Sequence, residues 1–330
     1  MSPQRLVVLT DTSIHADAVD RLRACATLRI LDGYPDETAL IEACRDADAI
    51  LARLGVVTGR VIEAAPRLRI IARHGAGSDG VDLPAATARG IVVTTAGPAN
   101  AGAVAEYTIA LLLGFLRKVP LADRSMRDGL WTREPLVGEA LEGRTLGIVG
   151  CGAVGARVAR IAVAFGMNVL ASQPRLLRQD PLPVPTAPLH EVLARSDIVS
   201  LHLRLTPETA GLVDAAAIGA MKPGAVLVNT ARGELVDEPA LIAALWSGRL
   251  AGAALDTYAV EPLPPGSPLR RMSNVLISPH VAGQTHQAVL RVGHTAVQAI
   301  LDEFAGKRPA FVVNPEAYAE RQRINQLPTR

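Results

Sequence analysis

Aromatic residues and cysteines are scarce in this 330-residue chain. Phe, Trp and Tyr together make up 3% of it, so the core must consist mainly of Ala, Val, Leu and Ile. The three cysteines, Cys25, Cys44 and Cys151, have no C-x-x-C spacing, and an odd number does not suit a disulfide framework. We therefore expect no metal site and a reducing, cytoplasmic compartment.

An excess of one charge and long apolar runs are also lacking. The 34 basic and 32 acidic residues leave a formal net charge of +2 without a long basic run, so nothing supports nucleic-acid binding. No apolar stretch reaches the length of a membrane span, and the run at 6–10 is too short for a signal peptide. With 49% hydrophobic and 20% charged residues, the chain should be globular, with one large domain or two of ordinary size.

Short apolar runs alternate with helical patterns from residue 1 to about 98. Alternation of this kind predicts parallel strands joined by right-handed crossovers, and hence a small α/β unit. Helices are expected over 17–26 and 59–65, and strands over 6–10, 48–53, 68–72 and 91–94.

The segment 101–116 is apolar on nearly every face, which predicts a helix buried between two domains or between subunits. A second α/β series begins at residue 146 and closes with a long helix over 284–305, after which 309–315 should be extended. Further strands are expected over 168–171, 197–202, 225–229, 252–255 and 275–278.

Gly150, Gly152 and Gly155 follow the apolar run at 146–149 and precede a helical pattern. Gly150 permits a tight turn, Gly152 lets a pyrophosphate approach the backbone, and Gly155 lets the helix pack on the strand. The spacing alone is weak evidence in a chain with 28 glycines. Cys151 suits a small apolar filler better than a redox role. The predicted pyrophosphate-binding residues are Gly150, Cys151, Gly152, Ala153, Val154 and Gly155.

No carboxylate occurs at 171–175, where an acid that reads the adenosine ribose of NAD is expected. Gln173 can bond a hydroxyl without repelling a phosphate, and Ser172 and Arg175 can bind one. These residues favour acceptance of NADP as well as NAD. The alternative is that Arg175 is a solvated loop charge.

Three stretches at the expected carboxyl ends of strands each carry one residue suited to the reduction of a 2-keto acid. Arg232 presents a planar fork that can hold a carboxylate and polarise a carbonyl. His280 can protonate the carbonyl oxygen, and Glu261, if it lies beside the imidazole, would favour its charged form and fix its orientation. Each residue alone has an ordinary structural explanation, but the combination after a glycine turn favours catalysis.

With these motifs in order, the sequence resembles the D-isomer-specific 2-hydroxyacid dehydrogenase family, which includes phosphoglycerate dehydrogenases and glyoxylate/hydroxypyruvate reductases. The resemblance covers almost the whole chain. It implies that Arg232 binds substrate, Glu261 tunes the histidine, and His280 donates the proton. The motifs that carry the resemblance are Gly150-x-Gly152-x-x-Gly155, 206–209, 229–233, Glu261-Pro262 and 278–280. The predicted cofactor-binding residues also include His202, Thr230, Ala231, Asp256 and Gly283.

The resemblance implies two Rossmann-like or flavodoxin-like, doubly wound parallel-sheet domains with a cleft between them. Residues 1–99 and 286–330 would form a discontinuous substrate domain, and 100–285 the dinucleotide-binding domain. Members of the family are usually homodimers, and 124–135, with Trp131, resembles their dimer arm.

Substrate contacts are also expected from the first domain. The loop 73–79 resembles the family's carboxylate-binding loop, in which the backbone N–H groups of Ala76 and Gly77 turn towards an anion, although a plain glycine turn is the alternative. Arg53 ends a strand and could meet a distal phosphate or carboxylate. Asn100 could bond a ligand or cap the helix that follows it. The predicted substrate-binding set is Arg53, Ala76, Gly77, Asn100, Arg232 and His280.

The leading hypothesis is an NAD(P)-dependent 2-hydroxyacid dehydrogenase that reduces a small 2-keto acid such as hydroxypyruvate or glyoxylate. Phosphoglycerate oxidation is the rival, and we expect it less because the chain ends soon after the closing helix and leaves no room for a regulatory domain. Formate oxidation is disfavoured because residue 261 is an acid, and a dimeric corepressor that binds dinucleotide is disfavoured because the catalytic set is intact. The sequence departs from the family pattern at two positions: Gln173 replaces the usual NAD-selecting acid, and Arg204 replaces a common proline.

Overall fold

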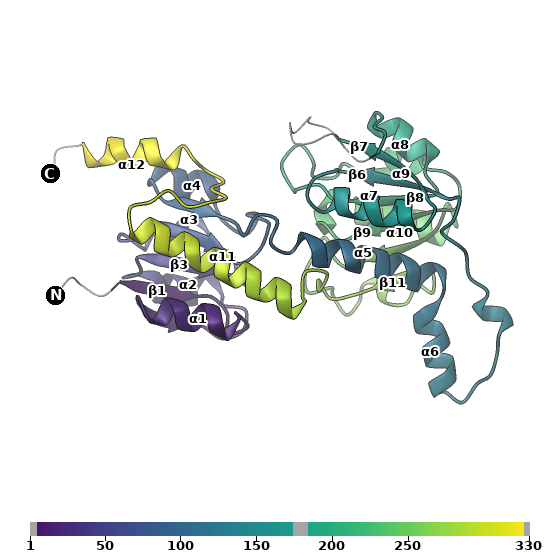
Figure 1. Ribbon diagram of the computed structural model, residues 1–330, viewed down its shortest axis with the longest axis horizontal. Helices are drawn as coiled ribbons and strands as arrows, with labels where there is room; N and C mark the ends of the chain where they lie inside the picture. Colours follow the sequence, from purple (N-terminus) through teal and green to yellow (C-terminus); the bar gives the residue numbers. More distant parts are fainter. Residues whose placement is uncertain (1–4, 174–183, 327–330) are drawn as a thin grey trace. The chain divides into compact units, whose positions relative to one another are not determined.

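A computed structural model describes residues 5–173 and 184–326 of the chain. The chain forms two compact units (Figure 1). Unit 1 combines the residues up to Asn100 with those from Gln284 onward, and unit 2 comprises Ala101–Gly283. The sequence-based domain boundaries, after residue 99 and before residue 286, lie within two residues of these. Each unit contains one parallel sheet with helices on both faces, so the predicted class of two doubly wound α/β domains is confirmed.

The sheet of unit 1 has five parallel strands in the order β2-β1-β3-β4-β5. Successive side chains of a strand face opposite sides, so Val7 and Leu9 pack under α1 and α11, while Val8 packs under α2, α3 and α4. The strands are β1 (Leu6–Leu9), β2 (Thr27–Ile30), β3 (Ala49–Ala52), β4 (Ile70–Arg73) and β5 (Val92–Thr94), and the helices are α1 (Ala16–Arg23), α2 (Glu37–Cys44), α3 (Gly59–Glu63), α4 (Leu83–Ala88), α11 (His286–Phe304) and α12 (Ala317–Asn325).

Side-chain caps start several of these helices. Asp36, Thr58 and Asp82 each accept a hydrogen bond from a backbone N–H three residues further on, at α2, α3 and α4. Thr285 does the same for α11. The caps explain why helices as short as five residues begin where the sequence turns from polar to apolar.

The sheet of unit 2 has six parallel strands in the order β11-β10-β9-β8-β6-β7. One core contains residues of α5 and α7, and a second core contains residues of α8, α9 and α10. The strands are β6 (Thr145–Val149), β7 (Asn168–Ser172), β8 (Ile198–Leu201), β9 (Ala225–Asn229), β10 (Leu250–Leu255) and β11 (Val275–Ile277), and the helices are α5 (Ala101–Leu116), α6 (Val119–Arg127), α7 (Gly155–Ala164), α8 (Leu189–Arg195), α9 (Ala215–Ala220) and α10 (Glu238–Trp246), with 3-10 turns at Glu134–Leu136, Gly233–Leu235 and Pro268–Arg270.

Some sequence-based expectations are wrong in detail. The segment 309–315, expected to be extended, forms no strand: Val312 makes only an isolated bridge with Thr94, and residues 310, 311 and 315 lie in turns. The chain turns there because Phe311 has a left-handed φ of 55° and Asn314 accepts a hydrogen bond from the backbone N–H of Val93. The strand β2 and the helix α12 were not foreseen. Among the described residues, no helix is long and apolar enough to cross a membrane, and no group of ligands suits a metal ion.

The helix α12 is tied to the rest of unit 1 by a buried acid. Glu303 on α11 is 2% exposed and contacts Arg69 Nη2 at 3.3 Å and Arg321 Nη1 at 2.5 Å. Arg321 also donates to the carbonyl oxygens of Gly90 and Arg69 at 2.8 Å. The acid therefore joins the loop before β4, α11 and α12 in one network.

Replacing Glu303 by Ala should lower the free energy of unfolding by about 2 kcal/mol, because two guanidinium groups lose the carboxylate between them. Equilibrium urea unfolding measures the loss. Glu42→Ala is the matched control, since Glu42 pairs with Arg45 at a surface where both side chains are more than 60% exposed, and we expect a change within about 0.5 kcal/mol. Equal losses in the two variants would contradict the network.

Candidate functional site

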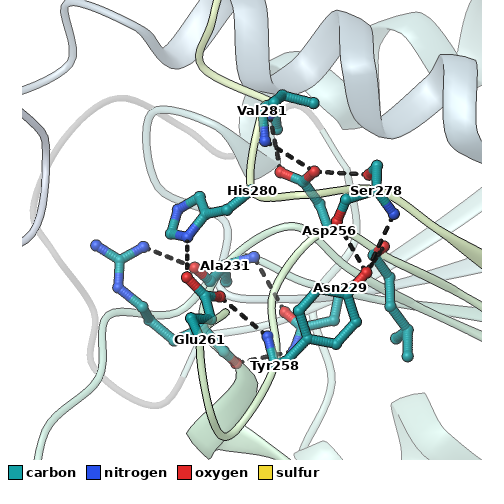
Figure 2. A network of polar contacts seen from close by, with 11 residues as sticks. Asn229, Ala231, Asp256, Tyr258, Glu261, Ser278, His280 and Val281 are labelled. Carbon is teal, nitrogen blue, oxygen red and sulfur yellow. Dashed lines mark hydrogen bonds and ion pairs between the residues drawn. The ribbon is translucent and has the colours of Figure 1, made fainter. Parts of the chain in front are cut away.

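The carboxyl ends of β9, β10 and β11 carry a network of connected polar residues (Figure 2). Asn229 ends β9, Asp256 follows β10, and Ser278 follows β11. The three strands are adjacent and parallel, so these ends lie at one edge of the sheet. In open α/β sheets, ligands bind at this edge.

Glu261 and His280 form a close pair at this edge. Glu261 Oε2 lies 2.6 Å from His280 Nδ1, and the two side chains are 35% and 45% exposed. The other carboxylate oxygen of Glu261 accepts a hydrogen bond of 3.0 Å from the backbone N–H of Tyr258. Because Nδ1 is engaged with the acid, Nε2 is the ring nitrogen left for exchanging a proton with a ligand.

Electrostatics links Arg232 to this pair. Burial raises the pKa of Glu261, but the hydrogen bond and charge of His280, the N–H of Tyr258 and the charge of Arg232 outweigh it, so the pKa lies below its ordinary value of 4.5. The guanidinium of Arg232 also donates to the carbonyl oxygen of Ala231 at 2.7 Å. A guanidinium, a carboxylate and an imidazole thus share one edge of the sheet.

The turn that carries Arg232 is shaped by its neighbours. The side chain of Asn229 accepts from the N–H of Ala231 at 3.0 Å and donates to the carbonyl oxygen of Arg232 at 2.8 Å. A Cβ at Gly233 would lie 1.8 Å from the carbonyl carbon of Tyr258, so only glycine fits there. The stretch 229–233 therefore holds a conformation that depends on its particular residues.

The glycine turn between β6 and α7 has the predicted sterics. Gly150 adopts a φ of 95°, and a Cβ at Gly155 would lie 2.2 Å from the carbonyl oxygen of Gly150. A Cβ at Gly152 would meet nothing within 4 Å, so open space lies in front of the backbone. Ala153 and Val154 complete the turn, and α7 follows it directly. This shape fits a pyrophosphate.

Two polar residues follow the glycine turn in space at the end of β7. Gln173 Oε1 accepts a hydrogen bond of 2.6 Å from the backbone N–H of Cys151, whereas Ser172 is only 4% exposed. Burial raises the pKa of the Cys151 thiol, as expected of a small apolar filler of the turn. Arg175 lies outside the described residues.

The other predicted cofactor-binding residues are spread along the same edge. His202 bonds Ser200 Oγ at 2.9 Å, and its removal from water lowers its pKa to about 4, so the ring is neutral at neutral pH. Thr230 Oγ1 lies 2.8 Å from Thr108 Oγ1 on α5. Ala231 follows Thr230, and Gly283 is the last residue of unit 2.

Asp256 is fully buried, and its carboxylate is bonded to the segment 278–282. Its carboxylate accepts hydrogen bonds from Ser278 Oγ at 2.6 Å and from the N–H groups of Val281 and Ala282 at 2.9 and 2.8 Å. Figure 2 shows the carboxylate pointing towards the segment that carries His280. These contacts place Asp256 beneath the predicted proton donor.

In unit 1, Arg53 lies within a polar cluster at the carboxyl ends of β1, β3 and β4. Its Nε lies 2.7 Å from Asp11 Oδ2, its Nη1 lies 3.0 Å from His74 Nδ1, and its Nη2 donates to Gln284 Oε1 at 3.3 Å. Burial, followed by the charge of Arg53, lowers the pKa of His74 to about 3. The neutral ring can then accept from the guanidinium.

The remaining predicted substrate residues lie at two places in unit 1. Ala76 and Gly77 belong to the loop after β4, where Arg73 Nε donates to the carbonyl oxygen of Gly77 at 3.4 Å. Asn100 is half-buried at the last position before unit 2 begins. Asp11 and Tyr258 were missed from the sequence, although each closely follows a predicted strand.

A family model described as "D-isomer specific 2-hydroxyacid dehydrogenase, NAD binding domain" matches residues 109–282. The chain is 40% identical over 311 residues to a D-3-phosphoglycerate dehydrogenase of Mycobacterium tuberculosis, covering 93% of this chain and 58% of the relative. It is 39% identical over 295 residues to a glyoxylate reductase of Korarchaeum cryptofilum, covering 87% of this chain and 89% of the relative. The chain therefore belongs to the D-isomer specific 2-hydroxyacid dehydrogenase family.

Solved structures show the same relationship. The TT0316 protein from Thermus thermophilus has a TM-score of 0.87 at 39% identity, with 93% of this chain and 99% of that chain covered. An NADPH-dependent glyoxylate/hydroxypyruvate reductase from Sinorhizobium meliloti, in complex with NADP and malonate, has a TM-score of 0.86 at 32% identity, with coverage of 96% and 98%. By contrast, the chain spans somewhat more than half the length of the curated phosphoglycerate dehydrogenases that it matches.

The lowered pKa of Glu261 predicts a pH-dependent contribution to stability. Because the folded-state pKa lies below 4.5, the ionised acid stabilises the protein above that pH, and this contribution is lost as the pH falls through the folded-state value. The melting temperature of Glu261→Gln should therefore lie below that of the wild type at neutral pH and approach it in acid. Glu142→Gln, an exposed acid of the same unit, is the control. A difference that does not shrink in acid would contradict the assignment.

Proposed function

We propose that this protein is an NAD(P)-dependent 2-hydroxyacid dehydrogenase that works as a reductase of small 2-keto acids such as hydroxypyruvate and glyoxylate. The observation that carries the proposal is the 2.6 Å contact between Glu261 and His280, with the charge of Arg232 acting on the same carboxylate. An acid–imidazole pair beside a guanidinium is what protonation of a carbonyl oxygen requires when the substrate is anchored by a carboxylate.

The chain's residues divide the work as follows. Arg232 binds the substrate carboxylate and polarises the keto group. His280 donates the proton to the carbonyl oxygen from the nitrogen that does not contact Glu261, and Glu261 stabilises the imidazolium and holds the ring. Arg53, Ala76, Gly77 and Asn100 supply further substrate contacts from unit 1, which would act as the substrate domain.

A nicotinamide dinucleotide supplies the hydride for this reaction. The turn from Gly150 to Gly155 would hold its pyrophosphate, since open space lies in front of Gly152 and the N-terminus of α7 follows. Unit 2 would thus be the dinucleotide-binding domain. His202, Thr230, Ala231, Asp256 and Gly283 would lie along the nicotinamide side, at the ends of β8, β9, β10 and β11.

Gln173 supports acceptance of NADP as well as NAD. Its carbonyl oxygen is engaged by the N–H of Cys151, which leaves the amide NH2 group to donate to a ribose hydroxyl or to a phosphate. The relative from Sinorhizobium meliloti is NADPH-dependent. Ser172 and Arg175 are proposed to assist.

Oxidation of phosphoglycerate is the second candidate, because several relatives with about 40% identity are D-3-phosphoglycerate dehydrogenases. Arg53 would then meet the distal phosphate. A dinucleotide-binding corepressor is the alternative from another class.

We also propose a cytoplasmic homodimer. The three cysteines are free, as a reducing compartment requires. In unit 2, α6 and the residues after it project away from the sheet (Figure 1), and no residue of α6 is buried. Large apolar side chains gather there, which a second copy of the chain would cover: Val119, Leu121, Met126, Leu130 and Trp131, each more than 50% exposed.

The proposal is tested by oxidation of NADH and NADPH with glyoxylate, hydroxypyruvate and 3-phosphohydroxypyruvate. We expect turnover with the unphosphorylated acids, and His280→Ala should lower kcat at least about 100-fold while the dinucleotide Kd stays within about twofold. His190→Ala, an exposed histidine of unit 2, is the control. Preference for the phosphorylated acid would favour the second candidate. Tight dinucleotide binding without any turnover would favour the corepressor.

Cofactor preference is tested by Gln173→Glu. A carboxylate of the same length keeps the contact with the N–H of Cys151 and repels a 2′-phosphate, so the ratio of kcat/KM for NADPH to that for NADH should fall about tenfold or more. Steady-state kinetics with both cofactors measure the ratio. Gln298→Glu introduces the same charge on the exposed face of α11 and should leave the ratio unchanged. An unaltered ratio in Gln173→Glu would show that residue 173 does not determine the cofactor preference.

A further inference from the structure

Glu261 and His280 lie on different segments of the chain, and both segments are attached to Tyr258. The backbone N–H of Tyr258 donates to Glu261 Oε1 at 3.0 Å. Its phenol donates to the carbonyl oxygen of Ser278 at 2.8 Å and accepts from the N–H of Ser278 at 3.1 Å. Ser278 stands two residues before His280 (Figure 2). A single residue is thus hydrogen-bonded both to the acid and to the segment that carries the imidazole.

The segment that carries His280 needs such support. His280 has a φ of 53°, in the left-handed region that residues with a side chain seldom adopt. Asp256 holds the segment from the other side, since its carbonyl oxygen accepts from the N–H of His280 at 2.9 Å and its carboxylate binds Val281 and Ala282. Without contacts on both sides, the backbone would relax to a more common conformation and move the ring.

The side chain of Tyr258 is held in place by packing and hydrogen bonds. It is 5% exposed and belongs to the core that contains Leu255, Leu263 and Leu269. Burial raises its pKa to about 12, so the phenol keeps its proton and can donate and accept at once. In the described part of unit 2, Glu261 contacts the imidazole and the charge of Arg232 acts on Glu261. The phenol oxygen bonds to backbone groups of Leu255 and Ser278.

We propose that Tyr258 is a positioning residue, whose phenol and backbone N–H together set the contact between Glu261 and His280. The inference rests on the proposed function, in which His280 donates the proton. A phenylalanine at this position would preserve the packing of the ring and remove only the contacts of the phenol oxygen.

The test is Tyr258→Phe, measured by the NMR titration of His280, whose signal among the seven histidines is the one missing from His280→Ala. A looser contact with Glu261 should lower the titration midpoint of the ring. In the same variant, kcat should fall about tenfold, the alkaline limb of the pH–rate profile for reduction should move to lower pH, and the dinucleotide Kd should not change.

Tyr318→Phe is the matched control, because the Tyr318 hydroxyl is buried in unit 1 without a hydrogen-bond partner among the described residues. It should titrate and turn over like the wild type. A His280 titration in Tyr258→Phe that equals that of the wild type would overturn the proposal, even if the melting temperature falls, because a purely structural role predicts that result. Absence of turnover in the wild type would instead contradict the proposed function, and the titration would still decide the role of Tyr258.

Discussion

The parallel alignment of β9, β10 and β11 is the constraint on which the site of unit 2 depends. Residues 229, 256 and 278 are separated by more than twenty positions each, yet they meet because neighbouring parallel strands end at the same edge. Glu261 and His280 extend from two of these ends and come within 2.6 Å of one another. Their contact is therefore a product of strand alignment and not of proximity along the chain.

Buried polar groups then convert this rough placement into a defined geometry. Asp256 is fully buried, and its carboxylate is saturated by donors from the segment that carries His280. A buried carboxylate without hydrogen-bond donors would destabilise the fold, so these hydrogen bonds fix the position of the segment. The same logic holds in unit 1, where the nearly buried Asp11 fixes the guanidinium of Arg53 and a neutral His74 accepts from it.

The cofactor turn shows a different kind of constraint, which is steric and local. Gly150 and Gly155 are needed because of backbone atoms a few residues away, whereas Gly152 faces open space. Gln173 joins this turn to the end of β7 through the N–H of Cys151. The turn lies within the part of the chain that matches the family's NAD binding domain model.

The sequence by itself determined the features that depend on local patterns. Buried runs such as 6–9 and 49–52 form strands, the apolar segment 101–116 is a helix, and the glycine spacing marks the turn. Only the tertiary structure decided the order of the strands. It also decided the edge strand β2, because its exposed ends Thr27 and Ile30 give no apolar pattern. The helix α12 is held by the ion pair of Arg321 with the buried Glu303. Tyr258 and Asp11 acquire their roles through contacts with residues 20 and 42 positions away, and no pattern along the chain encodes contacts that are created when distant strands align.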